Sequence, residues 1–268
     1  MSQAEYIFSD SQNLKERERL QIIEKIFDRK TRQRILKTGI TEKWQCLEIG
    51  AGAGSIAKWL ATVVGENGKV VAVDLETRFL ANIKSSNIEI LQADIRHLAL
   101  PNQSFDLIHA RYLLIHIPDF QLALSKMLDL LKPGGWLVIE EPDFSAARAI
   151  TGEDTMCASV NRVKQAIQQM FTDRGMDYAL GVKLPGIFQK LGLQKLSVEN
   201  DASLDCGGSD MAKMMKMSTM QLTQKYIATG AVTHSDIEKY CLFADDPNTW
   251  AIYYATVGVI GQKSENPN

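Results

Sequence analysis

The sequence has few cysteines and no long apolar run. Its 268 residues include four cysteines, scattered without the paired spacing of a zinc site or the density of a disulfide-rich secreted domain. No stretch reaches the roughly 20 apolar residues that a membrane-spanning helix needs. The first twenty residues are polar and charged, unlike a secretory leader. We therefore expect reduced thiols and a cytoplasmic protein, with no metal centre and no membrane partner.

An excess of charge of either sign is also missing. The chain has 30 Lys and Arg against 32 Asp and Glu, so its net charge is −2. Nucleic-acid-binding proteins usually carry a basic excess, so no nucleic-acid partner is expected. With 45% hydrophobic residues, the chain is long enough to bury a large core.

Short β-branched runs alternate with helical patterns between residues 45 and 141. The predicted strands are 46–49, 70–73, 88–91, 105–110 and 136–139, and the helices between them are 55–64, 78–85 and 120–131. Such alternation builds βαβ units and a parallel sheet covered on both faces. Two further strands, 193–200 and 256–261, are expected to complete a doubly wound, seven-stranded, mostly parallel α/β sheet with helical cap insertions.

The segments around this block suggest five parts. They are an N-terminal helical lid (1–40), the α/β core (41–150), a helical cap segment (151–192), the last two strands with a helical insertion at about 203–250 (193–262), and a polar tail (263–268). Ligands of open α/β sheets bind at the carboxyl ends of the strands. The helical insertions are therefore expected to cover that edge.

A glycine loop, Gly50-Ala51-Gly52-Ala53-Gly54, follows the first strand and precedes a helix. Glycines there let the backbone approach a ligand closely. A dinucleotide loop has a third glycine where this chain has Ser55, and no Gly-Lys-Ser/Thr follows as in a phosphate-binding P-loop. Glu48, just before the loop, would repel a pyrophosphate and suits a cationic or amino-bearing ligand.

Acidic residues end the next two strands. Asp74 stands twenty residues after Gly54, where a carboxylate can accept hydrogen bonds from both ribose hydroxyls. Asp94 ends the third strand and is placed to bind the exocyclic amine of adenine, with Ile95 packing near the ring. Each aspartate alone would more often be a surface or capping residue. Together, beside a glycine loop, they predict a nucleoside site.

These motifs together resemble the class I S-adenosylmethionine-dependent methyltransferases, in the branch that modifies small molecules. The resemblance covers residues 45–143 and rests on Glu48–Gly54, Val73-Asp74-Leu75, Gln92-Ala93-Asp94-Ile95, Leu100–Asp106 (LPNQSFD) and Leu131–Gly135 (LKPGG). It implies a Rossmann-like methyltransferase fold, S-adenosyl-L-methionine as cofactor, and methyl transfer to a small-molecule acceptor. Oxygen and nitrogen nucleophiles are slightly preferred, and carbon stays open.

The resemblance also implies roles for single residues. Those implied to line the methionine part and the ribose are Glu48, Gly50, Ala51 and Gly52. Those implied to bind the ribose and adenine are Asp74, Leu75, Asp94 and Ile95. Arg111 would offer its backbone carbonyl to the amino group of the cofactor, and Tyr6 would close over the site from the lid.

His116, just beyond the fourth strand, would lie over the methyl group of the cofactor. It is a candidate general base or substrate-orienting residue, and the alternative is a structural role. Glu140, Glu141 and Asp143 either face the same cleft or are solvated loop carboxylates. His109, inside the fourth strand, is expected to be packed or hydrogen-bonded.

Residues 211–220 hold five of the ten methionines. This segment is either the packed core of a cap helix or the roof of an apolar substrate pocket. Lys213 and Lys216 beside it either select an anionic substrate or are solvated. Three other functions stay open: a tRNA or protein methyltransferase, a non-catalytic cofactor-binding protein of the same fold, and a nicotinamide-dependent dehydrogenase, which Ser55 and Glu48 disfavour.

Overall fold

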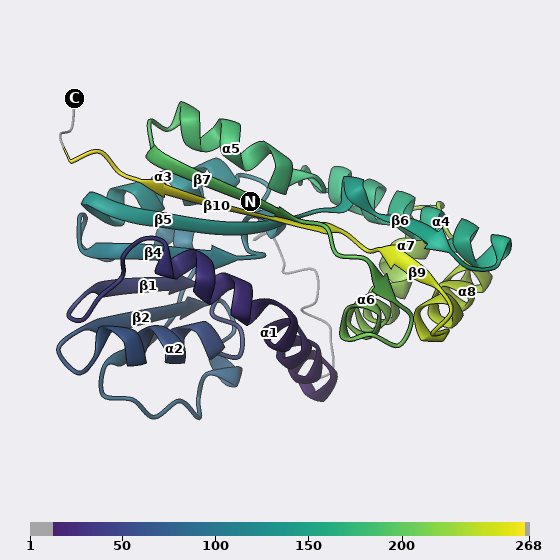
Figure 1. The fold of residues 1–268 in the computed structure, drawn as a ribbon, viewed down its shortest axis with the longest axis horizontal. Coiled ribbons are helices and arrows are strands. Elements are labelled where there is room, and N and C mark those ends of the chain that lie inside the picture. The colour runs from purple at the N-terminus through teal and green to yellow at the C-terminus, as the bar shows by residue number, and fades with distance from the viewer. Residues whose placement is uncertain (1–12, 266–268) are drawn as a thin grey trace.

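A seven-stranded sheet forms the centre of the molecule in the computed structural model, which describes residues 13–265 (Figure 1). Its strand order is β3-β2-β1-β4-β5-β10-β7. The strands are β1 (Gln45–Ile49), β2 (Lys69–Asp74), β3 (Ile88–Gln92), β4 (Phe105–Arg111), β5 (Leu131–Asp143), β7 (Gln194–Asp201) and β10 (Ala255–Gln262). Strand β10 runs antiparallel to both β5 and β7, and the other pairs are parallel. The predicted fold class is confirmed.

Helices cover both faces of this sheet. The four that pack on it are α1 (Asn13–Leu36), α2 (Ser55–Val64), α3 (Phe120–Leu130) and α5 (Leu180–Lys190). Alternate residues of a strand point to opposite faces. Cys46 of β1 accordingly joins Leu60 of α2 in one apolar cluster, whereas Leu47 joins Leu124 of α3 and Leu184 of α5 in another. Among residues 13–265, no helix is long and apolar enough to cross a membrane.

A cap lies beyond the carboxyl ends of the parallel strands (Figure 1). It is built from β6 (Arg148–Thr151), α4 (Asp154–Thr172), β8 (Asp205–Cys206), α6 (Asp210–Gln221), α7 (Thr223–Ala228), α8 (His234–Asp245) and β9 (Trp250–Ile252). Its three strands form a second sheet in the order β6-β9-β8. The apolar cluster that contains Leu47 continues into the cap through Met214 and Tyr240. Sheet and cap therefore share one hydrophobic core.

Short 3-10 helices complete the loops at the carboxyl edge of the sheet. They are η1 (Thr77–Phe79), η2 (Ile95–His97), η3 (Leu114–His116) and η4 (Phe144–Ala146). The predicted helix over 78–85 is wrong, since only η1 forms there. That segment contains Asn82 and Ser85, residue types that favour turns over helix interiors. Strand β5 also extends through Asp143, four residues beyond the predicted strand end.

Candidate cofactor and acceptor site

The glycine loop takes a backbone conformation that favours glycine. Gly50, Gly52 and Gly54 have φ values of 72°, 56° and 86°, in the left-handed region where other residues are strained. A Cβ atom on Gly54 would lie 2.4 Å from the Cδ1 atom of Ile83. The amide of Gly50 donates to the carbonyl of Val73 at 2.8 Å. The loop is therefore bent tightly against the end of β2.

Asp74 joins this loop to the end of β2. Its Oδ2 atom accepts a hydrogen bond from the amide of Gly52 at 2.9 Å, and its Oδ1 atom accepts one from the amide of Glu76 at 2.9 Å. Burial raises the pKa of Asp74, and these backbone bonds oppose the shift. Leu75, the next residue, is 52% exposed. An acidic group and an exposed apolar side chain thus stand side by side at the end of β2, and their predicted nucleoside contacts stay a prediction.

Asp94 caps the short helix η2 at the end of β3. Its carboxylate accepts from the amide of Arg96 and forms an ion pair with the guanidinium of the same residue, Nη2 to Oδ2, at 2.6 Å. Arg96 lowers the pKa of Asp94 by these hydrogen bonds and its charge. Ile95 is buried in the core. Asp94 lies at the predicted strand end, but its carboxylate already has a strong partner.

Glu48 belongs to a buried charge network on the sheet. Its Oε2 atom lies 2.6 Å from Nδ1 of His109, whose Nε2 lies 3.3 Å from Oε1 of Glu140. Oε2 of Glu140 accepts from Nη1 of Arg34 at 2.5 Å. Burial lowers the pKa of His109, but the charges and hydrogen bonds of the two glutamates outweigh it and raise that pKa to about 9. Burial also raises the pKa of Glu48, although the charge and hydrogen bond of His109 oppose this shift. Glu48 and His109 are thus bound to each other, and His109 is hydrogen-bonded as predicted.

Arg34 of α1 was not identified from the sequence. Besides Glu140 it pairs with Glu199 and Asp201 at the end of β7. Its guanidinium lies on Gly258 of β10, where a Cβ atom would come within 2.3 Å of Nε. A glycine inside a strand often marks a close approach by another group. Gly258 therefore indicated in the sequence that another group lies close to β10, but it did not identify Arg34 as that group.

Arg111, at the end of β4, directs its side chain to α1. Its Nη1 donates to Oγ1 of Thr31 at 2.8 Å, and its Nη2 lies 3.1 Å from Oδ1 of Asp28. The same Oδ1 accepts from the Ser55 hydroxyl, and Glu24 accepts from the Ser55 amide. Helix α1 is thereby fastened both to β4 and to the start of α2. The predicted role of Arg111 concerns its carbonyl and stays a prediction.

Glu141 holds the turn that carries His116. It is fully buried and accepts backbone hydrogen bonds from Leu113, Leu114 and Ile115 at 3.0, 2.7 and 3.2 Å. Burial raises the pKa of Glu141 to about 8 even though these three donors oppose the shift. The solvated-loop interpretation is wrong for this residue, and also for Glu140 and Asp143, which are buried in β5. Their burial was missed because the strand is longer than predicted.

His116 lies in apolar surroundings beneath the cap. Its ring centroid is 6.2 Å from that of Phe171 in α4. Burial, together with the nearby charge of Arg19, lowers the pKa of His116 to about 3. The imidazole is therefore neutral near pH 7. A neutral ring can accept or donate a hydrogen bond, although so low a pKa makes it a weak general base.

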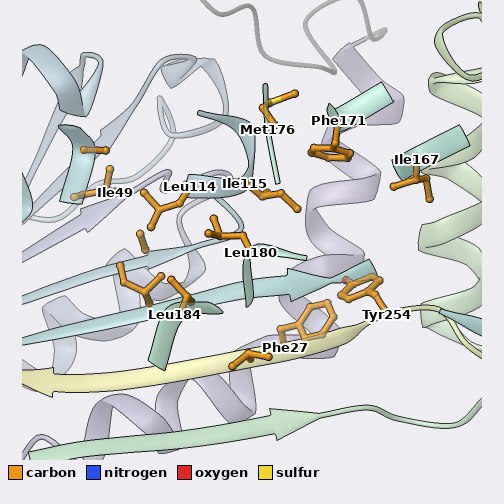
Figure 2. Close-up of a cluster of buried hydrophobic side chains, with 14 of the residues drawn as sticks. Phe27, Ile49, Leu114, Ile115, Ile167, Phe171, Met176, Leu180, Leu184 and Tyr254 are labelled. Carbon is orange, nitrogen blue, oxygen red and sulfur yellow. The ribbon is translucent and has the colours of Figure 1, made fainter. Parts of the chain in front are cut away.

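Aromatic side chains fill the junction between sheet and cap. Phe27 from α1, Phe171 from α4 and Tyr254 belong to one buried cluster with Leu114 and Ile115 (Figure 2). The centroid of Tyr254 lies 6.2 Å from that of Phe27 and 5.2 Å from that of Phe144. These rings belong to the buried core and keep water out of the junction.

The methionine-rich segment is the cap helix α6. Met211, Met214 and Met215 are buried in the shared core, whereas Met220 is exposed. The core interpretation is therefore confirmed for these three methionines. Lys216 pairs with Asp245 of α8 at 2.5 Å.

Helix α1 covers the glycine loop from outside. Cδ2 of Leu20 lies 3.7 Å from the point where a Cβ atom of Gly52 would be. Surface hollows of about 660 and 410 Å³ flank this helix. Neither is lined by a predicted cofactor residue, because α1 lies over the loop. Tyr6, the predicted closing residue, lies outside the described residues.

Comparison with known sequences places the central segment in a family. Residues 47–139 match the model of a methyltransferase domain. The methyltransferase str2 of Strobilurus tenacellus is 37% identical over 105 residues, covering 38% of this chain and 36% of that protein. The ubiquinone/menaquinone biosynthesis C-methyltransferase UbiE of Saccharophagus degradans is 33% identical over 113 residues, covering 39% of this chain and 45% of that protein. The match thus spans less than half the length of these curated relatives.

Solved structures extend the likeness to the fold. Phosphoethanolamine N-methyltransferase 2 of Haemonchus contortus, in complex with phosphomonomethylethanolamine and S-adenosylhomocysteine, aligns with a TM-score of 0.61 at 16% identity, covering 98% of this chain and 61% of that one. The [4+2]-cyclase SpnF aligns with a TM-score of 0.57 at 18% identity, covering 89% of this chain and 81% of that one. Shape at such identities establishes fold and not activity. Residues 47–139 thus match a methyltransferase domain, and the chain shares the fold of these solved structures.

Proposed function

We propose that this protein transfers a methyl group from S-adenosylmethionine to a small-molecule acceptor held beneath the cap. The observation that carries the proposal is the hydrogen bond between Asp74 and the amide of Gly52. It brings the acidic end of β2 against the glycine loop, inside the segment that matches the methyltransferase domain. Both are features that a nucleoside with an amino-acid arm requires.

The residues at this edge fit such a cofactor. The left-handed glycines Gly50 and Gly52 expose backbone amide groups without a side chain in the way. Asp74 uses one bond per carboxylate oxygen on the backbone, and each oxygen keeps a lone pair for a ribose hydroxyl. Leu75 offers an open apolar side chain to the adenine ring. Ala51 would line the methionine part with these glycines, and Asp94 and Ile95 would lie toward the adenine edge.

Glu48 and Arg111 are proposed to act on the cofactor in a more limited way than the other predicted residues. The Glu48 carboxylate is bound to His109, so its part in cofactor binding is proposed to be the negative charge that it places below the glycine loop. Arg111 is proposed to act through its backbone carbonyl, since its side chain is bound to α1.

The cofactor supplies an electrophilic methyl group on a sulfonium, which a nucleophile displaces in line. The protein's part is to align the acceptor and to exclude water. The aromatic junction around Tyr254 and Phe171 excludes water. His116 is proposed to hydrogen-bond the acceptor, since the ring is neutral near pH 7. Glu141 is a positioning residue that keeps the turn of His116 in place.

Binding calorimetry tests the proposal. S-adenosylhomocysteine should bind the full chain, and NAD should not. Asp74→Ala should weaken this binding by at least about a hundredfold, because it removes two hydrogen bonds to a charged group, each worth roughly 1.5–3 kcal/mol. Glu76→Gln, two residues away and exposed, is the matched control and should bind normally. A folded wild-type protein that does not bind S-adenosylhomocysteine would refute the function, and normal binding by Asp74→Ala would refute the assignment of this residue.

The acceptor class needs its own measurement. Isotope-labelled S-adenosylmethionine should label small metabolites in preference to tRNA or protein, because the cap lies over the carboxyl ends of the parallel strands (Figure 1). The near-neutral net charge of −2 also argues against a polyanionic partner. Labelling of tRNA or protein alone would favour the alternatives. Cofactor binding without transfer to any of the three would favour a non-catalytic protein.

A further inference from the structure

Tyr112, the residue that follows β4, has a backbone conformation that a tyrosine rarely adopts. Its φ is 55°, in the left-handed region where a bulky side chain is strained. Among residues 13–265, the other residues besides glycine with a positive φ are Lys43, Gln103 and Lys195, and all three are exposed. Tyr112 is instead half-buried and aromatic. Such outliers persist only where the surrounding structure enforces them, and they gather at functional sites.

Contacts with three other segments hold Tyr112 in this conformation. Its amide donates to the carbonyl of Glu140 in β5 at 2.8 Å, and its hydroxyl lies 2.6 Å from Oγ1 of Thr256 in β10. Its ring packs edge-on against the rings of Phe27 and Tyr254, with centroids 5.2 and 5.9 Å away. A glycine or an asparagine would take the same backbone with less strain. The tyrosine side chain adds what those residues lack, because it fastens the turn to α1 and to β10.

The turn at Tyr112 fixes the direction of the Arg111 carbonyl. The peptide group between Arg111 and Tyr112 is trans, so its N–H and C=O bonds point in opposite directions. The N–H bond points to β5, because it donates to Glu140. Strand β4 lies between β5 and β1. The Arg111 carbonyl therefore points toward the end of β1, where the glycine loop begins.

The chain leaves β1 before it supplies the next partner of this carbonyl. The last paired residues are Ile49 of β1 and Ala110 of β4. If the parallel ladder continued, the amide of Ala51 would donate to the Arg111 carbonyl. That amide donates instead to the carbonyl of Val73 at 3.2 Å. The carbonyl at the end of β4 is therefore available to a donor group of a ligand that lies on the glycine loop.

The same turn brings the next residue onto the glycine loop. Cδ1 of Leu113 lies 3.2 Å from the point where a Cβ atom of Gly50 would be. The amide of Leu113 donates to Glu141 at 3.0 Å, which holds the far side of the turn. An extended backbone at Tyr112 would continue β4 and carry Leu113 away from Gly50. The left-handed residue thus determines which groups after β4 face the loop.

We propose that Tyr112 is a positioning residue for methyl transfer, which holds the Arg111 carbonyl toward the amino group of S-adenosylmethionine. The inference rests on the proposed function, since that amino group belongs to the proposed cofactor. The charged amino group donates a hydrogen bond to the carbonyl. Tyr112 acts through Arg111. Its left-handed backbone directs the carbonyl, and its hydroxyl and ring keep the turn from relaxing to an extended conformation.

Calorimetry with two nucleosides tests this role. S-adenosylhomocysteine carries the amino-acid arm and methylthioadenosine lacks it, so the ratio of their affinities reports on the arm alone. Tyr112→Val should lower this ratio at least about tenfold, because a β-branched residue resists positive φ and one hydrogen bond to a charged group is lost. Tyr112→Gly turns freely and should keep a higher ratio than Tyr112→Val. Tyr112→Phe loses only the hydroxyl contact and should lie closest to the wild type.

Lys43→Val is the matched control. Lys43 has a φ of 71° and precedes β1, at the opposite edge of the sheet from the glycine loop. The variant places a β-branched residue under the same strain and should leave the ratio unchanged. If Tyr112→Val does not fold, Tyr112→Ala is compared with Tyr112→Gly. Both lack the ring, but only alanine is strained at positive φ, so Tyr112→Ala should have the lower ratio.

Four results would overturn the inference while leaving the proposed function intact. They are a wild-type protein that binds both nucleosides equally, an unchanged ratio in a folded Tyr112→Val variant, the same ratio in the valine and glycine variants, and a ratio lowered as strongly by Lys43→Val. A purely structural role of Tyr112 would weaken both nucleosides equally and leave the ratio unchanged. Failure of the wild-type protein to bind S-adenosylhomocysteine is a different outcome, which refutes the proposed function itself.

Discussion

His109 and His116 are seven residues apart, the first fully buried and the second half-buried, and their surroundings drive their pKa values in opposite directions. His109 lies on the sheet between Glu48 and Glu140, which raise its pKa to about 9 against the effect of burial. His116 lies beneath the cap, where burial and the charge of Arg19 lower its pKa to about 3. Burial alone therefore does not decide the charge of a histidine. The partner that the fold brings to it does.

The region beneath the glycine loop and the region beneath the cap differ in the same way, in the charges that they contain. Beneath the glycine loop, charges of opposite sign alternate through Glu48, His109, Glu140 and Arg34. Beneath the cap, aromatic and aliphatic side chains dominate. The charged region ties α1 to the sheet. The apolar region joins the sheet to the cap.

The largest effect is expected from breaking the charged region at Arg34. Arg34→Met leaves Glu140 buried without its arginine partner, and loss of one partner of a buried pair typically costs about 3–5 kcal/mol. Urea denaturation should show this as a fall in the free energy of unfolding. The double variant Arg34→Met/Glu140→Gln should recover much of the loss, because the uncompensated carboxylate is gone. A single variant as stable as the wild type would show that the network is not a stabilising unit.

A second effect, of similar size, concerns pH and compares the two histidines directly. The folded-state pKa of His109, about 9, exceeds the unfolded value of about 6.5. Its contribution to stability is therefore fully present below about pH 6.5 and is lost as the pH rises through 9. The pKa of His116 is instead lower in the folded state than in the unfolded state. Its contribution to stability is therefore lost as the pH falls from about 6.5 toward 3. Over their full pH ranges, these contributions are on the order of 3 kcal/mol for His109 and 5 kcal/mol for His116.

NMR titration of the two imidazoles checks this comparison. The ring signals of His109 should move only above about pH 8, and those of His116 should stay at their neutral positions down to about pH 4. His109→Gln and His116→Gln assign the signals. Two histidines that both titrate near pH 6.5 would contradict the contrast and with it the description of both regions.

The α/β core was readable from the sequence because its signals are local. Strand ends were marked by Asp74 and Asp94, and the glycine loop by residues that favour left-handed backbone. Five short apolar runs alternating with helices left few topologies open. The seven strands and the doubly wound sheet followed from these signals, whereas the nucleoside edge stays a prediction.

The network and the cap could not be read in this way, because their contacts join distant parts of the chain. Arg34 meets Glu140 across 106 residues, and no local pattern encodes that meeting. The strands β8 and β9 are two and three residues long, too short for a period-two signal. The sequence did not reveal the burial of Glu141, because nothing in its own segment indicates that three backbone amides just after β4 donate hydrogen bonds to it.

The smallest effect is expected at the outer end of the charged region. Lys37 pairs with Glu199, the same carboxylate that Arg34 contacts, but it is half exposed whereas Arg34 is buried. Lys37→Ala should change the free energy of unfolding by at most about 1 kcal/mol, because solvent screens an exposed pair and its side chain regains freedom. Raising the salt concentration should shrink this difference further. Urea denaturation of Lys37→Ala beside Arg34→Met at low and high salt measures both. A loss as large as that of Arg34→Met would mean that a shared partner, and not burial, sets the strength of each contact.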